Sequence, residues 1–424
     1  MHVGIVGGGI TGLALVHELS ERDIDATCFE ANPQPGGVIQ SSRIDGVVVE
    51  HGPQRMRLSG IVESYLEQFG LADDLIIADA ELPIYVYFEG KLRPVPFDLL
   101  TGITTDALSL RGKLRLLKEP FVSAGRPGET AASYFSRKLG HEAYHNLIEP
   151  LFGGLYASDP GSMPVRHALE PLLALERRKG SLTRIALSRM RGRDERPPAV
   201  VPVDGMQALP SAIAKRYAES IHLGTLVDRI EEDGDGRFSI HAGTRSKAVD
   251  HVVIATDAHA AGGLVEPLDA TSAESLTSLT YNPLAMVYLR GPTDRQGLGF
   301  QMRRDEPYET LGVSWNGVAF GRDDLHTVFL GGMHHPTLIE QSDERLCTIA
   351  ADEYRELLDI ETTCLGVHRV RPGMPAYDHT WDRLEEVALP DGVHLVGSYT
   401  ARVGIPGRLR QARTLADRLE THTE

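Results

Sequence analysis

The sequence is short of cysteine. Its 424 residues include three, Cys28, Cys347 and Cys364, which lie far apart and form no Cys-x-x-Cys motif. Its 17 histidines include the adjacent His334 and His335, and no Cys/His spacing suits a structural zinc site. We therefore expect three reduced, mostly buried thiols, as in a cytoplasmic protein, and no metal site.

Long apolar runs and an excess of positive charge are also absent. No run of about 18 apolar residues occurs, which argues against a membrane-spanning helix. The apolar N-terminus lacks the basic leader of a signal peptide. The formal net charge of −16 argues against nucleic acid as a partner. The length predicts roughly three domain-sized units, so we expect a cytoplasmic globular protein.

The N-terminus carries a dinucleotide-binding pattern. Residues 2–6 predict a buried strand, and Gly7, Gly9 and Gly12 follow with G-x-G-x-x-G spacing where a helix is expected to begin. Such glycines allow a tight turn and a close approach of the backbone to a pyrophosphate at the helix N-terminus. A second apolar run ends at Glu30, whose carboxylate can accept both hydroxyls of an adenosine ribose. The pattern therefore predicts a dinucleotide site.

A second glycine pair, Gly36 and Gly37, follows Glu30 after a short Pro-containing stretch. A loop at this place can close over the same cofactor. An NAD dehydrogenase does not need such a loop, whereas a protein that buries a whole FAD does, so we predict FAD. Taken alone, the pair also fits a Pro/Gly turn with no ligand.

The order of the apolar segments predicts an α/β fold of interwoven domains. Alternating strand and helix patterns, helical periodicity over residues 61–78 among them, are typical of an FAD-binding Rossmann-like domain of the G-x-G-x-x-G type. Strand patterns with one buried face indicate a mixed-sheet substrate domain, and a mainly helical block is inserted. The expected ranges are 1–82, 200–265 and 372–424 for the FAD-binding domain, 83–96 and 266–371 for the substrate domain, and 97–199 for the helical insertion.

The helical insertion ends in a basic stretch. Residues 177–196 hold eight arginines and lysines against Asp194 and Glu195, interleaved with apolar residues. This amphipathic pattern suits the surface of an anionic bilayer, or the attraction of a carboxylated substrate or partner. A solvated helix with a loop fits the same pattern. The first interpretation predicts peripheral contact with the inner face of the membrane.

Motifs outside the first turn resemble one enzyme family. They are residues 129–140 (ETAASYFSRKLG), 149–159 (EPLFGGLYASD), 205–209 (GMQAL) and 403–406 (VGIP). Together with the glycine turn, they make nearly the whole chain resemble the FAD-dependent protoporphyrinogen and coproporphyrinogen oxidases of the amine oxidase superfamily. Arg402 and Gly407 depart from the glycine and the polar residue that are usual around the last motif.

The resemblance and the glycine patterns imply a set of FAD contacts spread over the chain. They lie in the first turn, after the second strand, in the two loops that follow, and in later segments that would return to the same site. The implied residues are Gly7, Gly8, Gly9, Ile10, Thr11, Gly12, Glu30, Ala31, Gly36, Gly37, Val38, Gly52, Pro53, Gln54, Arg55, Val227, Trp381, Gly397, Val403, Gly404 and Ile405.

The resemblance also implies a substrate pocket, in which this chain departs from the family. The carbonyl of Gly154 would accept a hydrogen bond from a pyrrole N–H, and Phe329 would lie against the macrocycle, although a strand Phe also fits an ordinary core. Ile84 stands where eukaryotic members have a propionate-binding arginine. Gln301 and Ser314 stand where two leucines enclose the ring. Candidates for the missing charge are Arg55, Arg57, Lys91 and Arg93.

The activity that the resemblance implies is oxidation of a porphyrinogen, protoporphyrinogen IX or coproporphyrinogen III, to the porphyrin in haem biosynthesis. A hydride would leave a methylene bridge for flavin N5, and oxygen would reoxidise the flavin and give peroxide. No side chain is therefore expected to act as a catalytic residue. The implied partners are a tetrapyrrole and oxygen.

Two other functions fit the sequence. The first is a flavin amine oxidase or polyene desaturase, although 6% aromatic residues and two tryptophans limit the means to build an aromatic cage. The second is a non-catalytic tetrapyrrole-binding flavoprotein, which the altered pocket would suit. The oligomeric state stays open, with a homodimer among the alternatives.

Overall fold

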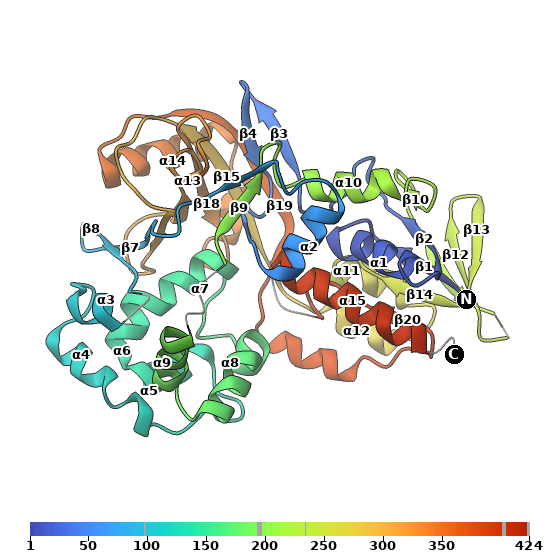
Figure 1. Ribbon diagram of the computed structural model, residues 1–424, viewed down its shortest axis with the longest axis horizontal. Helices are drawn as coiled ribbons and strands as arrows, with labels where there is room; N and C mark the ends of the chain where they lie inside the picture. The colour runs from blue at the N-terminus through green and yellow to red at the C-terminus, as the bar shows by residue number, and fades with distance from the viewer. Residues whose placement is uncertain (97–98, 193–196, 234, 401–403, 422–424) are drawn as a thin grey trace.

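The structure, a computed structural model, describes residues 1–96, 99–192, 197–233, 235–400 and 404–421. Within these ranges the chain forms a five-stranded sheet with helices, a seven-stranded sheet and a helical region, which lie at the right, the upper left and the lower left of Figure 1. The predicted α/β fold, with a Rossmann-like part, a mixed sheet and a helical insertion, is confirmed.

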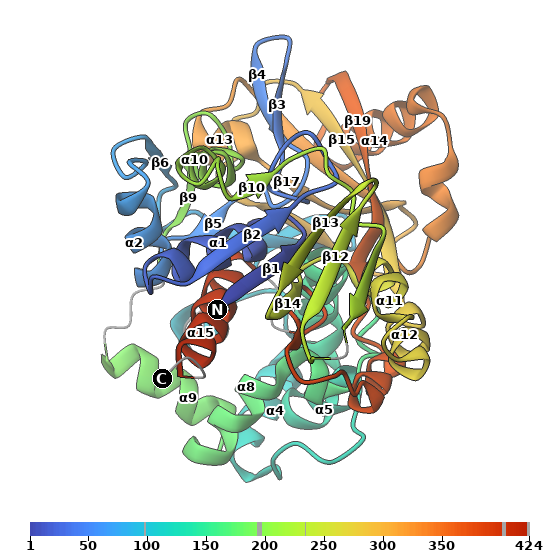
Figure 2. The ribbon, with the colours of Figure 1, turned by 90° about the vertical axis from the view of Figure 1, so that its right-hand side faces the viewer.

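The five-stranded sheet is parallel throughout and has the order β10-β2-β1-β14-β20. A parallel sheet that is covered on both faces needs apolar residues at successive positions, and Val3, Ile5 and Val6 of its central strand are all buried. Figure 2 shows these strands, drawn from distant parts of the chain, side by side. Their bounds are His2–Val6 (β1), Asp25–Phe29 (β2), Ile221–His222 (β10), His251–Ile254 (β14) and Val393–Leu395 (β20).

The two faces of this sheet have different covers. Val3 and Ile5 pack with the helices α1 and α15, which Arg413 and Glu18 join by an ion pair of 2.9 Å. On the other face, Gly4 lies against Ile240 in an antiparallel three-stranded sheet, next to two helices. The covering elements are α1 (Ile10–Ser20), α10 (Ala208–Arg216) and α15 (Ile405–Thr421), and β11 (Arg229–Glu232), β12 (Phe238–Ala242), β13 (Arg245–Val249), α11 (Ala258–Val265) and α12 (Ala270–Thr277).

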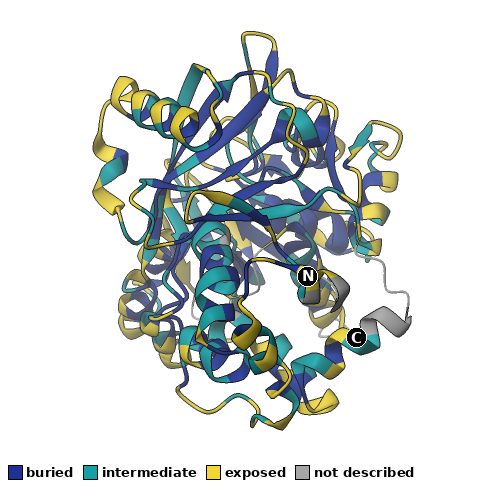
Figure 3. Ribbon diagram, turned by 90° about the vertical axis from the view of Figure 1, so that its left-hand side faces the viewer, coloured by how far each residue is buried: buried dark blue, intermediate teal, exposed yellow. Residues whose placement is uncertain are grey.

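The seven-stranded sheet has the order β19-β15-β18-β17-β16-β7-β8, antiparallel except between β16 and β7. Leu346, Ala350 and Tyr354 of helix α14 cover one of its faces, and Figure 3 shows its strands largely buried. The expected substrate residues lie on the opposite face of this sheet. The bounds are Ile84–Phe88 (β7), Lys91–Pro94 (β8), Tyr281–Arg290 (β15), Gly299–Met302 (β16), Thr310–Ser314 (β17), Asn316–Phe320 (α13), Leu325–Gly331 (β18), Pro336–Glu340 (η3), Asp343–Leu358 (α14) and Thr363–Pro375 (β19).

The helix expected over residues 61–78 is wrong in its second half. Helix α2 (Gly60–Gln68) ends before Gly70, whose φ of +70° favours glycine, and β6 (Leu75–Ile77) follows. Strand β6 pairs with a strand more than a hundred residues later, a contact that local periodicity cannot show. The remaining elements of this part are β3 (Ser41–Ile44), β4 (Val47–Glu50), β5 (Met56–Arg57), β9 (Ala199–Pro202) and η4 (His379–Glu386).

A buried lysine organises the helical region. The ammonium group of Lys138 lies 2.8 Å from Glu119 and 2.5 Å from Glu176, with all three side chains buried. Glu119 also accepts hydrogen bonds from the backbone N–H groups of Leu182 and Thr183, where α9 begins. Desolvation raises the pKa of Glu119, but these bonds lower it overall. The helices are α3 (Leu99–Thr104), α4 (Leu110–Leu116), η1 (Glu119–Phe121), α5 (Ala131–Leu139), α6 (His141–Ala143), η2 (Tyr144–Ile148), α7 (Glu149–Tyr156), α8 (Val165–Lys179) and α9 (Leu182–Gly192).

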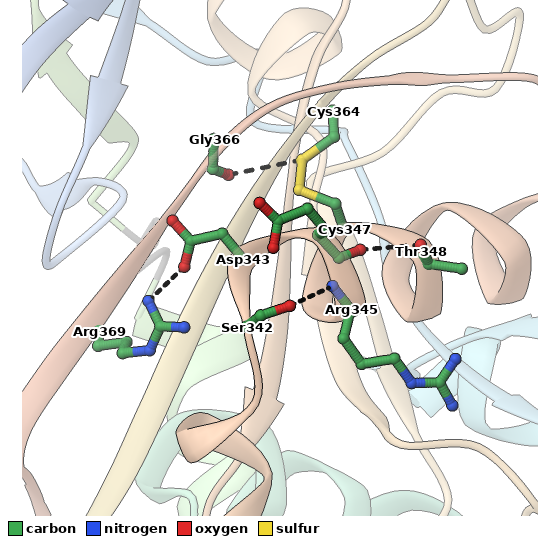
Figure 4. The surroundings of a disulfide bond; sticks show 9 residues. Ser342, Asp343, Arg345, Cys347, Thr348, Cys364, Gly366 and Arg369 are labelled. Atoms are coloured by element: carbon green, nitrogen blue, oxygen red, sulfur yellow. Dashed lines mark hydrogen bonds and ion pairs between the residues drawn. A yellow bond between two sulfur atoms is a disulfide. The ribbon is translucent and has the colours of Figure 1, made fainter.

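The expectation of three reduced cysteines is wrong for two of them. Cys347 of α14 and Cys364 of β19 form a disulfide, with their Cα atoms 5.7 Å apart (Figure 4). The pairing follows from the packing of α14 along the edge strand β19, which brings two distant positions to bonding distance. Cys28 is a buried free thiol, and desolvation raises its pKa.

The buried lysine is expected to control the stability of the helical region. The substitution Lys138→Met leaves two buried carboxylates without their cation, so the free energy of unfolding should fall by about 3 kcal/mol or more. Urea unfolding followed by circular dichroism measures the change. Lys215→Met, at an exposed lysine, is the matched control. Equal midpoints for Lys138→Met and the wild-type chain would contradict this role.

Candidate flavin and substrate site

The carboxyl ends of the parallel strands gather the expected cofactor residues at one edge. Gly7 follows β1, Glu30 follows β2, and Gly397 lies just beyond β20. The N–H of Gly7 donates to the carbonyl of Phe29 at 2.8 Å, which ties the first turn to the end of β2. In open α/β sheets this edge is where ligands bind.

The first turn has the geometry of a pyrophosphate cradle. Gly7 has a φ of +112°, and a Cβ on Gly12 would overlap the carbonyl oxygen of Gly7. A Cβ on Gly9, by contrast, would meet no atom within 4 Å. Gly9 is also the N-cap of α1, and no side chain caps the N–H groups at that helix end, where Ile10 and Thr11 begin the helix. An open glycine before an uncapped helix N-terminus fits the diphosphate of FAD.

Glu30 is held in place by its neighbours. The N–H of Gly8 donates to its Oε2 at 2.7 Å, and the backbone N–H and side-chain amide of Asn32 donate to its Oε1, both at 2.8 Å. The carboxylate is thus buried and oriented next to the first turn, with Ala31 following it. Sequence reasoning missed that Asn32 orients the carboxylate of Glu30. The available signal was an Asn two positions after the acid.

The second glycine loop lies directly on the first. The N–H of Gly36 donates to the carbonyl of Gly8 at 2.8 Å, and a Cβ on Gly37 would lie 3.2 Å from the Cα of Gly9. Both residues have positive φ, +115° and +61°. Val38, the next residue, is exposed. The structure therefore brings the two loops together, while their contact with a cofactor stays a prediction.

Two further segments reach the same region. A Cβ on Gly52 would overlap the carbonyl oxygen of Val38, so the loop of Gly52, Pro53, Gln54 and Arg55 runs against the second glycine loop. Near the carboxylate, the N–H groups of Gly224 and Thr225 donate to the carbonyls of Asn32 and Glu30 at 2.9 and 2.8 Å. These bonds place the segment that leads to the buried Val227 beside Glu30.

The expected cofactor residues near the C-terminus lie in different elements of the structure. Gly397 has a φ of +152° and follows Val396, whose N–H donates to the carbonyl of Ile254 beside β14. Gly404 and Ile405 open helix α15, which packs on α1. Val403 lies outside the described residues. Trp381 is buried in η4 with its ring centroid 4.2 Å from that of Tyr377.

The expected substrate residues come together on one face of the seven-stranded sheet. Gly299 pairs with both Ile84 and Ser314, and Gln301 and Phe329 both pair with Gly312. Directly paired residues point to the same side of a sheet, so these four side chains share a face. A Cβ on Gly154 would overlap the side-chain oxygen of Gln301, so α7 lies against the same place. The shared face is opposite the one that α14 covers.

The buried Asn316 connects this face to the loop of Gly52, Pro53, Gln54 and Arg55. The amide of Asn316 donates to the side-chain oxygens of Gln54 at 2.7 Å and Thr327 at 3.0 Å, and its oxygen accepts from the hydroxyl of Ser314 at 3.0 Å. Ser314 in turn accepts from Nη1 of Arg55 at 3.0 Å. Sequence reasoning missed Asn316, because no motif surrounds it and its partner Gln54 lies 262 residues away.

A cavity of about 270 Å³ lies at the other end of the shared face. Gly153, Met302, Leu311 and His334 are among the residues that line it. Met302 and Leu311 lie one position beyond Gln301 and Gly312 on the side away from Ser314, so the cavity lies next to this end of the strands β16 and β17. Burial lowers the pKa of His334.

The chain is similar to relatives of known name over nearly its whole length. The chain is 28% identical to protoporphyrinogen oxidase 1, chloroplastic, of Spinacia oleracea, over 99% of this chain and 85% of that protein. It is 26% identical to coproporphyrinogen III oxidase of Bacillus subtilis (strain 168), over 97% and 96%. A crystal structure from Exiguobacterium sp. 255-15, assigned as a protoporphyrinogen oxidase, has a TM-score of 0.81 at 23% identity and covers 99% of each chain, which shows a shared fold.

The family assignment rests on nearly the whole chain. Residues 10–419 match the family described as flavin containing amine oxidoreductase, from the first turn of α1 to the last turns of α15. The match confirms the predicted superfamily and the predicted flavin cofactor, FAD. The chain belongs to the flavin containing amine oxidoreductase family.

Proposed function

We propose that the chain oxidises a porphyrinogen, protoporphyrinogen IX or coproporphyrinogen III, to the porphyrin in haem biosynthesis. The observation that carries the proposal is the shared sheet face, on which Ile84, Gln301, Ser314 and Phe329 lie together with Gly154 against them. This face adjoins the Gly52 to Arg55 loop through Asn316. The names of the relatives in spinach and Bacillus subtilis support the same substrate class.

The residues of the cradle would hold the cofactor. Gly7 to Gly12 and the N-terminus of α1 would take the diphosphate, and Glu30 the ribose hydroxyls. Gly36, Gly37 and the Gly52 to Arg55 loop would enclose the rest. The chemistry that FAD supplies when bound is two-electron oxidation of a substrate carbon, with oxygen as the final acceptor.

The substrate residues would orient and shield a large ring. The carbonyl of Gly154 accepts from a pyrrole N–H, and Phe329 lies against the macrocycle. A flat sheet face opposite a bound cofactor fixes the reacting carbon and excludes water, which is most of what the protein must contribute when the cofactor carries the reaction.

Amine oxidation has less support. Trp315 is fully buried on the α14 side of the seven-stranded sheet, where it packs with Phe300. It therefore cannot contribute to an aromatic cage on the opposite, shared face. The other tryptophan, Trp381, stacks on Tyr377 in η4.

We also propose peripheral attachment to an anionic membrane, through a surface next to the basic stretch. Leu110 and Leu114 of α4, the adjoining Leu117, and Phe121 at the end of η1 are all exposed, Phe121 to 90%, and the spacing of Leu110 and Leu114 puts them on one side of α4. The interleaved Arg111, Lys113 and Lys118 are basic, and Glu119 ties this segment to the start of α9. Apolar side chains ringed by basic ones suit the boundary of an anionic bilayer. None of the described helices is long and apolar enough to cross a bilayer.

The first test of function is turnover. Purified protein should be yellow, and should convert coproporphyrinogen III or protoporphyrinogen IX into the fluorescent porphyrin while consuming oxygen. Fluorescence and peroxide are read together, with boiled enzyme correcting for spontaneous oxidation. A flavin-loaded preparation that is inert on both substrates would contradict the proposal.

The cofactor cradle is tested at Gly9. The methyl group added by Gly9→Ala meets no protein atom within 4 Å, so the unfolding midpoint of the apoprotein should not change. The same methyl would intrude on a diphosphate, so FAD affinity should fall on the order of tenfold or more. Gly263→Ala, also in open space, is the control. Unchanged FAD binding by Gly9→Ala, measured by flavin fluorescence quenching, would place the diphosphate elsewhere.

The membrane surface is tested by vesicle co-sedimentation. Replacing Leu114, Leu117 and Phe121 by Ser should lower binding to anionic vesicles on the order of tenfold or more, because each apolar side chain loses its burial in lipid. Leu226→Ser, at an exposed leucine elsewhere, is the control. Charge reversal at Arg189, Arg191 and Arg193 then measures what the basic stretch adds. Wild-type protein that stays in the supernatant would count against attachment.

A further inference from the structure

Arg55 is a cation without a counter-charge at the boundary of the two sites. Its Nη1 donates to the hydroxyl of Ser314 at 3.0 Å. Among the described residues, no carboxylate forms an ion pair with it, and the charged neighbour that affects it most is another cation, Arg57. Desolvation and Arg57 lower the pKa of Arg55 to about 10, which still leaves the group charged at neutral pH.

An isolated cation that is partly removed from water is costly. Taking a charged group out of water destabilises a protein unless a partner compensates for the lost hydration. One neutral hydroxyl uses a single donor of the five that a guanidinium group offers. The remaining donors suit a planar, two-oxygen acceptor such as a carboxylate.

The other candidate cations near the site are either paired or exposed to solvent. Arg93 pairs with Glu89 and Asp106. Arg57 is exposed and donates to the carbonyl of Pro197. Lys91 is exposed at the start of β8.

The arginines around the cavity at the far end of the face are engaged as well. Arg303 pairs with Asp305 at 2.6 Å, and Arg304 pairs with Asp159 at 3.0 Å. Among the cations considered at both ends of the face, Arg55 alone is part-buried without an acidic partner in the described structure.

The position of Arg55 relates it to the substrate face. Its partner Ser314 pairs with Gly299, and Gly299 also pairs with Ile84. The guanidinium group therefore lies at the Ile84 end of the face, where this chain has an apolar side chain instead of a cation. The hydroxyl of Ser314 donates to Asn316, so its lone pairs are left for Arg55.

We propose that Arg55 binds a carboxylate of the substrate and that Ser314 and Asn316 position it. The inference rests on the proposed function, because it assigns a residue to the recognition of that carboxylated macrocycle. Arg55 thereby determines which end of the ring system lies at the Gly52 to Arg55 loop. Ser314 is the residue that holds the guanidinium group, since it is the hydrogen-bond partner that the structure gives to Arg55.

The experiment compares Arg55→Met with the wild-type holoenzyme on coproporphyrinogen III and on its tetramethyl ester. We expect KM for the carboxylated substrate to rise on the order of tenfold or more, as for loss of a charged hydrogen-bonded pair. KM for the ester should rise far less than KM for coproporphyrinogen III, and the comparison is made per bound FAD, because Arg55 also belongs to the loop that would enclose the cofactor. Arg43→Met, an exposed arginine on β3, is the control. Ser314→Ala should give a smaller rise in KM than Arg55→Met.

A binding measurement separates this inference from the proposed function. Coproporphyrin III, the oxidised ring, is titrated into both proteins and followed by its fluorescence. Weaker binding by Arg55→Met supports the assignment even if the wild-type enzyme fails to turn over either porphyrinogen. Equal binding and equal KM in an active enzyme overturn it and leave the function standing. Loss of FAD, or a shifted flavin reduction potential with unchanged porphyrin binding, would assign Arg55 to the cofactor instead.

Discussion

A buried ion pair between Glu50 and Arg322 holds the two halves of the site in register. Nη1 of Arg322 lies 2.7 Å from Glu50, and the same guanidinium group donates to the carbonyls of Val48 and Pro202. Glu50 also accepts from the N–H of Met206. Desolvation raises the pKa of Glu50 and Arg322 opposes it. The pair thus fastens the turn before β18 to β4 and to the segment after β9, and a buried charge that lost its partner would cost several kcal/mol.

The site depends on this fastening because its two halves come from different sheets. The Gly52 to Arg55 loop starts two residues after Glu50, and α13 with Asn316 ends just before Arg322. The pair therefore helps to keep Asn316 within hydrogen-bonding distance of Gln54. The bonds among Asn316, Gln54, Thr327 and Ser314 join neutral groups, so hydrogen bonds and not further charges hold this part of the boundary.

Local pattern accounts for the geometry of the first turn and fails where distant segments pair. The turn from Gly7 to Gly12 and the acid at Glu30 lie within one strand, helix and strand, whose spacing alone fixes their geometry. The second half of residues 61–78 failed because β6 is set by a distant partner, β9. The disulfide of Cys347 and Cys364 failed for the same reason, since it follows from how α14 packs on β19. Pairings such as Arg322 with Glu50 span 272 residues and leave no trace in local periodicity.

The two unusual pocket residues, Ile84 and Ser314, can be explained together by the position of Arg55. Ile84 and Ser314 stand where the resemblance implies an arginine and a leucine, and both lie beside Gly299 on the shared face. The hydroxyl of Ser314 has a defined part at this position, because it accepts a hydrogen bond from the guanidinium group of Arg55. On the proposal above, the positive charge of the pocket lies on the loop that leaves β4 and not on β7. A single charge at one end of an otherwise uncharged face contributes orientation more than affinity, because the opposite orientation would leave a carboxylate against apolar side chains.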